Sequence, residues 1–121
     1  MSTFYKNAKV DLTNTNATTL YTAPTASSTA SPATAIFKSI LVADDSGSAS
    51  TITLTITDAS SNVFVLFNVK ATTGNGTVEL LSAPLVVEEG EALKVTAGNA
   101  NRLHVVGSYL EITERLTAYN N

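Results

Sequence analysis

The chain of 121 residues contains no cysteine and no tryptophan, and it has a single histidine. Without cysteine, neither a disulfide scaffold nor a thiolate metal site can form. Charged residues make up only 14% of the chain, against roughly 25% in an average soluble domain. The net charge is −3 and the seven lysines and arginines are scattered, so the chain lacks the clustered basic side chains that hold nucleic acid without regard to sequence.

Long apolar runs are missing as well. No stretch approaches the roughly 20 residues that a membrane-spanning helix needs, and residues 1–10 lack the apolar segment of a signal peptide. We therefore expect no nucleic-acid partner, no membrane partner, and a chain that is made and kept in a cytoplasm.

The most regular pattern lies between residues 36 and 70, where three apolar runs are separated by two short polar turns. In the middle run Ile52, Leu54 and Ile56 alternate with threonines. A period of two places the aliphatic groups on one face of a strand and the hydroxyls on the other. The turns are short enough to join antiparallel neighbours, so this stretch predicts a three-stranded meander.

The rest of the chain continues in the same way, with turn residues roughly every 8–12 positions and about eight or nine predicted strands in total. We expect an all-β fold, a two-sheet antiparallel β-sandwich of jelly-roll or immunoglobulin-like type, without a significant helix. The length suffices for one hydrophobic core. The expected organisation is an N-terminal arm at 1–9, a sandwich domain at 10–113 and a C-terminal tail at 114–121.

Candidates for chemistry are few. His104 has no sequence neighbours that would complete a catalytic or metal-binding group. Asp44, Asp45 and Asp58 lie at turns, where carboxylates bind calcium in some proteins but more often accept local hydrogen bonds. The acids at 88–91 surround a glycine and are typical of a solvated corner. We expect a non-enzymatic protein with no catalytic residue, no cofactor and no metal ligand, and leave open whether the Asp44–Asp45 turn binds an ion.

Several predicted strands are apolar on both faces, although a sandwich needs only its inner faces apolar. In one run, the alternation places Val63, Val65, Phe67 and Val69 opposite Phe64 and Leu66. In another, it places Phe37 and Leu41 opposite Ile36, Ile40 and Val42. A second apolar face favours contact with another subunit. The residues expected at such an interface are Phe4, Tyr5, Phe37, Leu41, Phe64, Leu66, Tyr109, Leu116 and Tyr119.

Four segments of the chain, in order, read TTLYTAP (18–24), AIFKSILVADDSGSASTITLTITDAS (35–60), VELLSAPLVVEEGEALKVTA (78–97) and LHVVGSYLEI (103–112). Their succession resembles a widespread family of tailed-bacteriophage virion proteins. In that family a TLYT-P strand precedes a KSI-V-N-SGS-ATVTL hairpin, an LEL and LEAGD-LKV-A pair follows, and SYLEI closes the fold. This chain departs from the pattern in its long segment at 24–34 and in Asp44-Asp45, which stands where Asn-Thr is usual.

The resemblance implies a small β-sandwich that assembles on the virion and has no catalytic residues. We expect a capsid decoration (cement) protein, made in the host cytoplasm, which forms a homo-oligomer, a trimer, on the outer shell and contacts the phage major capsid protein. A neck, tail or baseplate subunit is the alternative within the same class. From another class, a carbohydrate-binding module of a receptor-binding fibre remains open.

Overall fold

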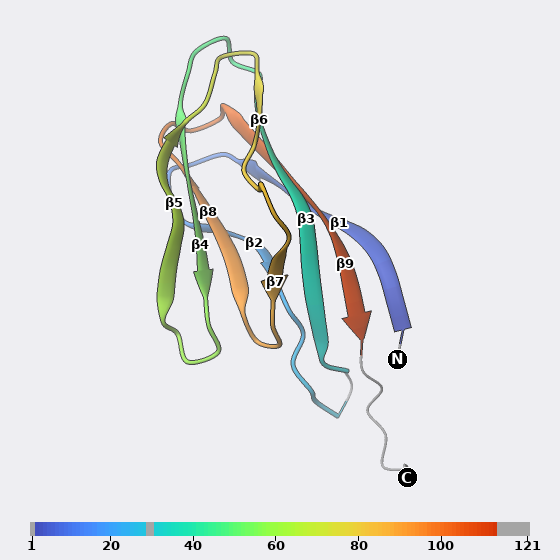
Figure 1. Ribbon diagram of the computed structural model, residues 1–121. Helices are drawn as coiled ribbons and strands as arrows, with labels where there is room; N and C mark the ends of the chain where they lie inside the picture. Colours follow the sequence, from blue (N-terminus) through green and yellow to red (C-terminus); the bar gives the residue numbers. More distant parts are fainter. Residues whose placement is uncertain (1, 29–30, 114–121) are drawn as a thin grey trace.

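A computed structural model describes residues 2–28 and 31–113, and these form nine β-strands in two antiparallel sheets (Figure 1). No helix occurs among the described residues, which confirms the predicted β-sandwich. None of the described segments is a helix long and apolar enough to span a membrane. The strands are β1 (Ser2–Leu12), β2 (Thr18–Thr22), β3 (Ala33–Asp44), β4 (Thr51–Thr57), β5 (Val63–Ala71), β6 (Thr77–Glu79), β7 (Leu85–Val87), β8 (Ala92–Ala97) and β9 (Leu103–Thr113).

The two sheets have a simple order. Sheet A consists of β1, β9 and β3, with β6 and β7 both paired to the outer edge of β3, and sheet B has the order β2-β8-β4-β5. Successive strands cross between the sheets at every step except from β4 to β5 and from β6 to β7. This is the topology of a jelly roll, one of the two types that the sequence left open. β5 lies at one side of the sandwich and β1 at the other (Figure 1).

The core lies between the sheets. It is built from alternating side chains, such as Ile52 and Leu54 of β4 and Leu93 and Val95 of β8, which are fully buried. The side chains that the predicted alternation places on one face of the middle strand therefore fill the core. At one end, the rings of Tyr21, Phe37 and Tyr109 pack together, with centroids 4.6–5.3 Å apart.

β3 corrects one sequence-based prediction. The expected alternation placed Phe37 and Leu41 on one face and Ile40 and Val42 on the other. The register of β3 against β9 shifts between Phe37 and Ser39, because one extra residue is inserted there. A bulge of this kind exchanges the two faces of a strand beyond it. Phe37, Ile40 and Val42 are consequently all 0% exposed, whereas Leu41 faces outward and is 39% exposed.

The segment expected to form an N-terminal arm is part of a strand in the structure. Residues 2–9 belong to β1, which pairs with β9 without interruption from Ser2 opposite Thr113 to Leu12 opposite Leu103. Most side chains of β1 are exposed, and the strand is held by its backbone ladder, which pairs the N–H and C=O groups that point toward β9. The predicted tail at 114–121, with Leu116 and Tyr119, lies outside the described residues.

Candidate interaction surfaces

More than half of the exposed large hydrophobic side chains of the described chain lie on β5. Every residue of this strand except Phe67 is exposed, although most of its side chains are aliphatic or aromatic. Sheet B ends here, since β4 is the sole ladder partner of β5 in the described chain. The exposed side chains are Val63 (60%), Phe64 (48%), Val65 (55%), Leu66 (38%) and Val69 (59%). We call these five side chains the β5 surface.

The pairing of β5 with β4 corrects a second prediction about faces. Phe67 lies opposite the buried Leu54, and Phe64 lies opposite Ile56, so both aromatic rings are on the core side of sheet B. The register shifts between them, which is why residues three positions apart share a face. Val63 and Val65 lie opposite Thr57 and Thr55 on the outer side. The simple alternation expected for this run was therefore wrong.

A second surface lies on the outer face of sheet A. Tyr5 of β1 pairs with Leu110 of β9, which pairs with Ile36 of β3, which pairs with Val86 of β7. The two ends of this row are the most exposed, Tyr5 at 83% and Val86 at 48%. The row therefore crosses the whole sheet and forms an apolar band, which we call the sheet A row.

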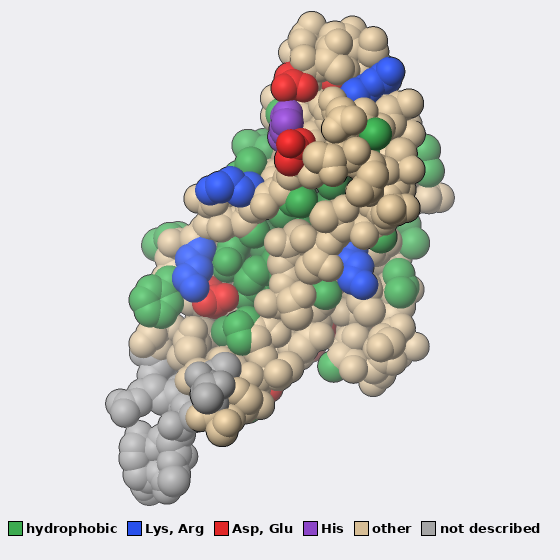
Figure 2. Space-filling model, turned by 180° about the vertical axis from the view of Figure 1, so that it is seen from behind, with side chains coloured by type: hydrophobic (Ala, Val, Ile, Leu, Met, Phe, Trp, Pro, Cys, Tyr) green, Lys and Arg blue, Asp and Glu red, His purple; other side chains and the backbone are tan. Residues whose placement is uncertain are grey.

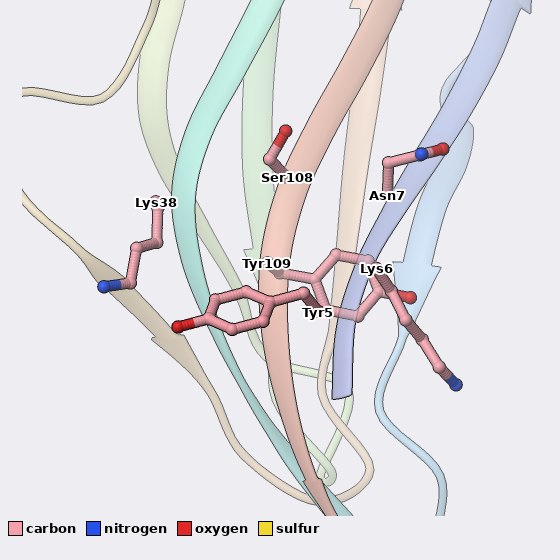
Figure 3. A pocket seen from close by; sticks show the side chains of 6 residues that line it. All are labelled: Tyr5, Lys6, Asn7, Lys38, Ser108 and Tyr109. Atoms are coloured by element: carbon pink, nitrogen blue, oxygen red, sulfur yellow. The ribbon is translucent and has the colours of Figure 1, made fainter. Parts of the chain in front are cut away.

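An open groove adjoins Tyr5. Its volume is about 400 Å³, and it is lined by Tyr5, Lys6, Asn7, Lys38, Ser108 and Tyr109. Figure 3 shows the ring of Tyr5 extending across β9 toward the side on which Lys38 lies, whereas Tyr109 points the other way. The groove thus combines one exposed aromatic face with amide, hydroxyl and ammonium groups.

A buried carboxylate lies beneath this region. Glu111 is 6% exposed, and it accepts hydrogen bonds from the Tyr21 hydroxyl at 2.6 Å and the Lys6 ammonium at 2.9 Å. Burial raises the pKa of Glu111, but the hydrogen bonds from Tyr21 and Lys6 outweigh it and hold the pKa below its ordinary value. Burial, together with the bond to Glu111, raises the pKa of Tyr21. All three groups are engaged with one another, so the network ties β1, β2 and β9 together.

His104 lies between two carboxylates. Its Nδ1 is 3.0 Å from Asp11 Oδ1, and its Nε2 is 3.0 Å from Asp45 Oδ2. The hydrogen bond to Asp45, supported by the charges of both acids, raises the pKa of His104. Figure 2 shows this histidine in purple among red acidic side chains, on a face where tan atoms predominate. The sequence analysis missed this arrangement, although Asp11 is the direct cross-strand neighbour of His104.

The turn aspartates use their oxygens within the protein. Asp44 is 2% exposed and accepts hydrogen bonds from the backbone N–H and hydroxyl of Ser46, which lower its pKa. Asp58 accepts from the backbone N–H groups of Ser60 and Asn62. Within residues 2–28 and 31–113, no group of three or more His, Cys, Asp or Glu side chains is arranged to hold a metal ion.

The structure separates the predicted interface residues into three groups. Phe37 and Tyr109 lie in the core, at 0% and 7% exposed, which corrects the expectation that they form an interface. Leu116 and Tyr119 lie outside the described residues. The exposed ones are Phe4 (48%), Tyr5 (83%), Leu41 (39%), Phe64 (48%) and Leu66 (38%). For these five, contact with a partner stays a prediction.

Comparison with known proteins does not assign this chain to a family. No family model and no curated protein matches this chain. Among solved structures, the chain is similar to one described as "Structure of infectious bursal disease virus Gx strain", with 10% identity and a TM-score of 0.46. The match covers 97% of this chain and 30% of the other, so this chain spans about a third of that protein.

Proposed function

We propose that this protein is a non-enzymatic structural subunit of a tailed-bacteriophage virion, and specifically a capsid decoration protein that forms homo-oligomers on the outer shell. One observation carries the proposal: a small, weakly charged jelly roll exposes two separate apolar surfaces, on β5 and on the outer face of sheet A. A decoration subunit needs two such surfaces, one for its own copies and one for the shell. The resemblance of four sequence segments to virion proteins supports the same assignment.

The size of these surfaces suits cooperative attachment. The β5 surface comprises on the order of 400 Å² of apolar area, given five side chains that are each about half exposed. At roughly 25 cal/mol per Å², burial of all five side chains, on both sides of the strand, contributes at most about 10 kcal/mol, against an association cost of about 4–15 kcal/mol. A single contact is therefore weak. Several contacts made together on a shell add up through effective concentration.

Three carboxylates that are hydrogen-bonded within the protein fit a non-enzymatic role. Glu111, Asp44 and Asp58 are each held by hydrogen bonds from neighbouring residues. None of them faces a cavity lined by a second acid or a nucleophile within the described chain. These groups stabilise strands and turns.

The proposal is tested by the copy number of this chain in purified virions, measured by quantitative mass spectrometry against the major capsid protein. A ratio near one to one is expected for a decoration protein on the shell. A much smaller number, a handful to a few dozen copies, would place the chain in the neck, tail or baseplate. Absence from the particles would refute a virion role.

The groove beside Tyr5 favours one alternative function, a carbohydrate-binding module of a receptor-binding fibre. An exposed aromatic ring next to the amide of Asn7 and the hydroxyl of Ser108 offers a stacking face and hydrogen-bonding groups for a sugar. Under this alternative, Tyr5→Ala abolishes glycan binding on an array and leaves attachment to shells unchanged. A decoration protein shows no glycan binding for Tyr5→Ala to remove.

A further inference from the structure

We propose that His104 forms a pH-dependent bridge across one end of sheet A, which we call the His104 bridge. When its ring carries two protons, it joins Asp11 of β1 to Asp45 of the turn after β3. When its ring loses one proton, it keeps Asp45 and releases Asp11. The inference goes beyond the proposed function and does not depend on it.

The His104 bridge lies where β1 and β3 end and β9 begins. β9 lies between the other two strands, and His104, its second residue, is opposite Asp11 of β1 and Ala43 of β3. Both neighbours of His104 in the strand point into the core, so its ring is on the outer face of the sheet. The turn after β3 comes to the same place, because the N–H of Asp45 donates to the C=O of Arg102 at 3.3 Å. One side chain thus joins two elements that are not neighbours in the sheet.

The distances show how many protons the ring carries. Nδ1 of His104 is 3.0 Å from Asp11 Oδ1, and Nε2 is 3.0 Å from Asp45 Oδ2. Figure 2 shows the ring in purple between two red carboxylates. A neutral imidazole has one N–H and one lone pair, so it donates to only one of the two acids and directs its lone pair at the other. The arrangement therefore requires the imidazolium, which donates from both nitrogens.

The two contacts of the ring are not equivalent. Nε2 forms a hydrogen bond with Asp45, whereas Nδ1 forms an ion pair with Asp11. The hydrogen bond to Asp45 contributes most to the raised pKa of His104, and the short-range contact with Asp11 contributes least. A neutral ring should therefore keep its proton on Nε2, so the contact with Asp11 is the one that is lost.

Other charged groups near the His104 bridge have partners of their own. On β1, Lys9 lines the same hollow as His104 and donates to the side chain of a neighbouring asparagine. Arg102, in the turn before β9, donates to a backbone carbonyl of the turn after β3. Asp44 of β3 and Glu79 of β6 accept hydrogen bonds from nearby hydroxyl and N–H groups. The acids that contact the imidazole within the described residues are thus Asp11 and Asp45 alone.

The sign of the pH dependence follows from the two acids. The hydrogen bond to Asp45, with the charges of both carboxylates, raises the pKa of His104 above its ordinary value of 6.5 despite partial burial. The His104 bridge is therefore complete below pH 6.5, as long as the carboxylates are ionised, and it is lost as the pH rises through the folded pKa. The three side chains are 43–68% exposed, so the effect is local to this end of the sheet.

An NMR titration of the isolated protein tests the bridge, because His104 is the single histidine and its ring signals do not overlap with others. We expect a pKa above 6.5, with both ring nitrogens protonated below it and the Nε2–H tautomer above it, as read from the nitrogen shifts. Asp45→Asn should lower this pKa more than Asp11→Asn does. Glu88→Gln is the matched control, since it removes one exposed carboxylate at the opposite end of β3, and it should leave the pKa unchanged.

Two crystal structures, at about pH 5.5 and about pH 9, test which contact is lost. At the lower pH both ring nitrogens should lie 3.0 Å from their carboxylates, as in the structure described above. At the higher pH the distance from Nε2 to Asp45 should stay the same. The distance from Nδ1 to Asp11 should then exceed about 3.5 Å, which is too long for a hydrogen bond.

A folded pKa of 6.5 or lower would overturn the His104 bridge, and so would a pKa that Asp11→Asn and Asp45→Asn lower no more than Glu88→Gln does. The release of Asp11 would be contradicted by a larger effect of Asp11→Asn than of Asp45→Asn, or by a neutral ring with its proton on Nδ1. An unchanged distance from Nδ1 to Asp11 at the higher pH would contradict it as well.

Discussion

Removal of the Tyr21 hydroxyl tests whether the buried network stabilises the fold. Tyr21→Phe keeps the ring, which packs edge-on against Phe37, and deletes one of the two side-chain donors to Glu111. A hydrogen bond to a charged group contributes about 1.5–3 kcal/mol, more than a neutral pair. Because Glu111 is 6% exposed, water replaces the lost donor poorly. We expect the free energy of unfolding to fall by about 2 kcal/mol at neutral pH.

The same network predicts how stability depends on pH. The pKa of Glu111 is lower in the folded protein than its ordinary value of 4.5, because the bonds from Tyr21 and Lys6 outweigh the effect of burial. A carboxyl group whose pKa is lower in the folded than in the unfolded state stabilises the fold at pH values above its unfolded pKa. This contribution is lost as the pH falls through its folded pKa. The wild type should therefore lose stability on acidification below about pH 4.5, and Tyr21→Phe should lose less.

Urea unfolding, followed by circular dichroism at neutral and acidic pH, measures both effects. Tyr109→Phe is the matched control, because it removes a hydroxyl group from the same aromatic cluster. No described residue forms a hydrogen bond with that hydroxyl, so the substitution should change the free energy of unfolding by less than about 0.5 kcal/mol. If Tyr21→Phe is as stable as the wild type and loses as much stability in acid, the hydrogen bond from Tyr21 to Glu111 does not stabilise the fold.

Three further changes test other features. His104→Gln should lower the free energy of unfolding by less than about 1 kcal/mol, because the imidazole is 43% exposed. The pKa of His104 is raised in the folded protein, so this difference from the wild type should be present in acid and vanish at alkaline pH. Unfolding curves at both pH values measure it. Gly74→Ala should destabilise by about 1–3 kcal/mol, measured by thermal melting, because a Cβ there would lie 2.5 Å from the carbonyl carbon of Gly47. Val69→Gly should stabilise by about 1 kcal/mol in the same assay, because a β-branched residue is strained at a φ of 52°; an unchanged or lower melting temperature would contradict this.

The sequence predicted the class of fold but not the faces of every strand. In β4 the alternation is strict, so Ile52 and Leu54 were correctly expected on one face. In β3 one register shift, and in β5 two, interrupt the alternation partway along the strand. The sequence alone does not mark where such a shift falls, because it depends on how a strand fits its neighbour. Phe37 was therefore expected at the surface and lies in the core.

The candidate surfaces were predictable only in part. Leu66 and Phe64 were singled out because their run is apolar on both faces, and the structure leaves both exposed at a sheet edge. Glu111 was missed, although it continues the inward series of Val105 and Tyr109 along β9 and so falls on the buried face. A carboxylate at an inward position requires partners, and its partners come from β1 and β2, far away in the sequence.

The ladder between β1 and β9 joins the first described strand to the last, and it has consequences for how the chain folds. Residues more than 90 positions apart pair along eleven consecutive positions, as Ser2 with Thr113 and Leu12 with Leu103. Pairings of such high contact order form slowly, because the intervening loop must close before any contact compensates for its entropy. During synthesis β1 emerges before the other described strands, and its partner β9 emerges after them. Sheet A therefore cannot be completed until the ribosome has released β9, and until then β1 is an open edge for other chains to meet.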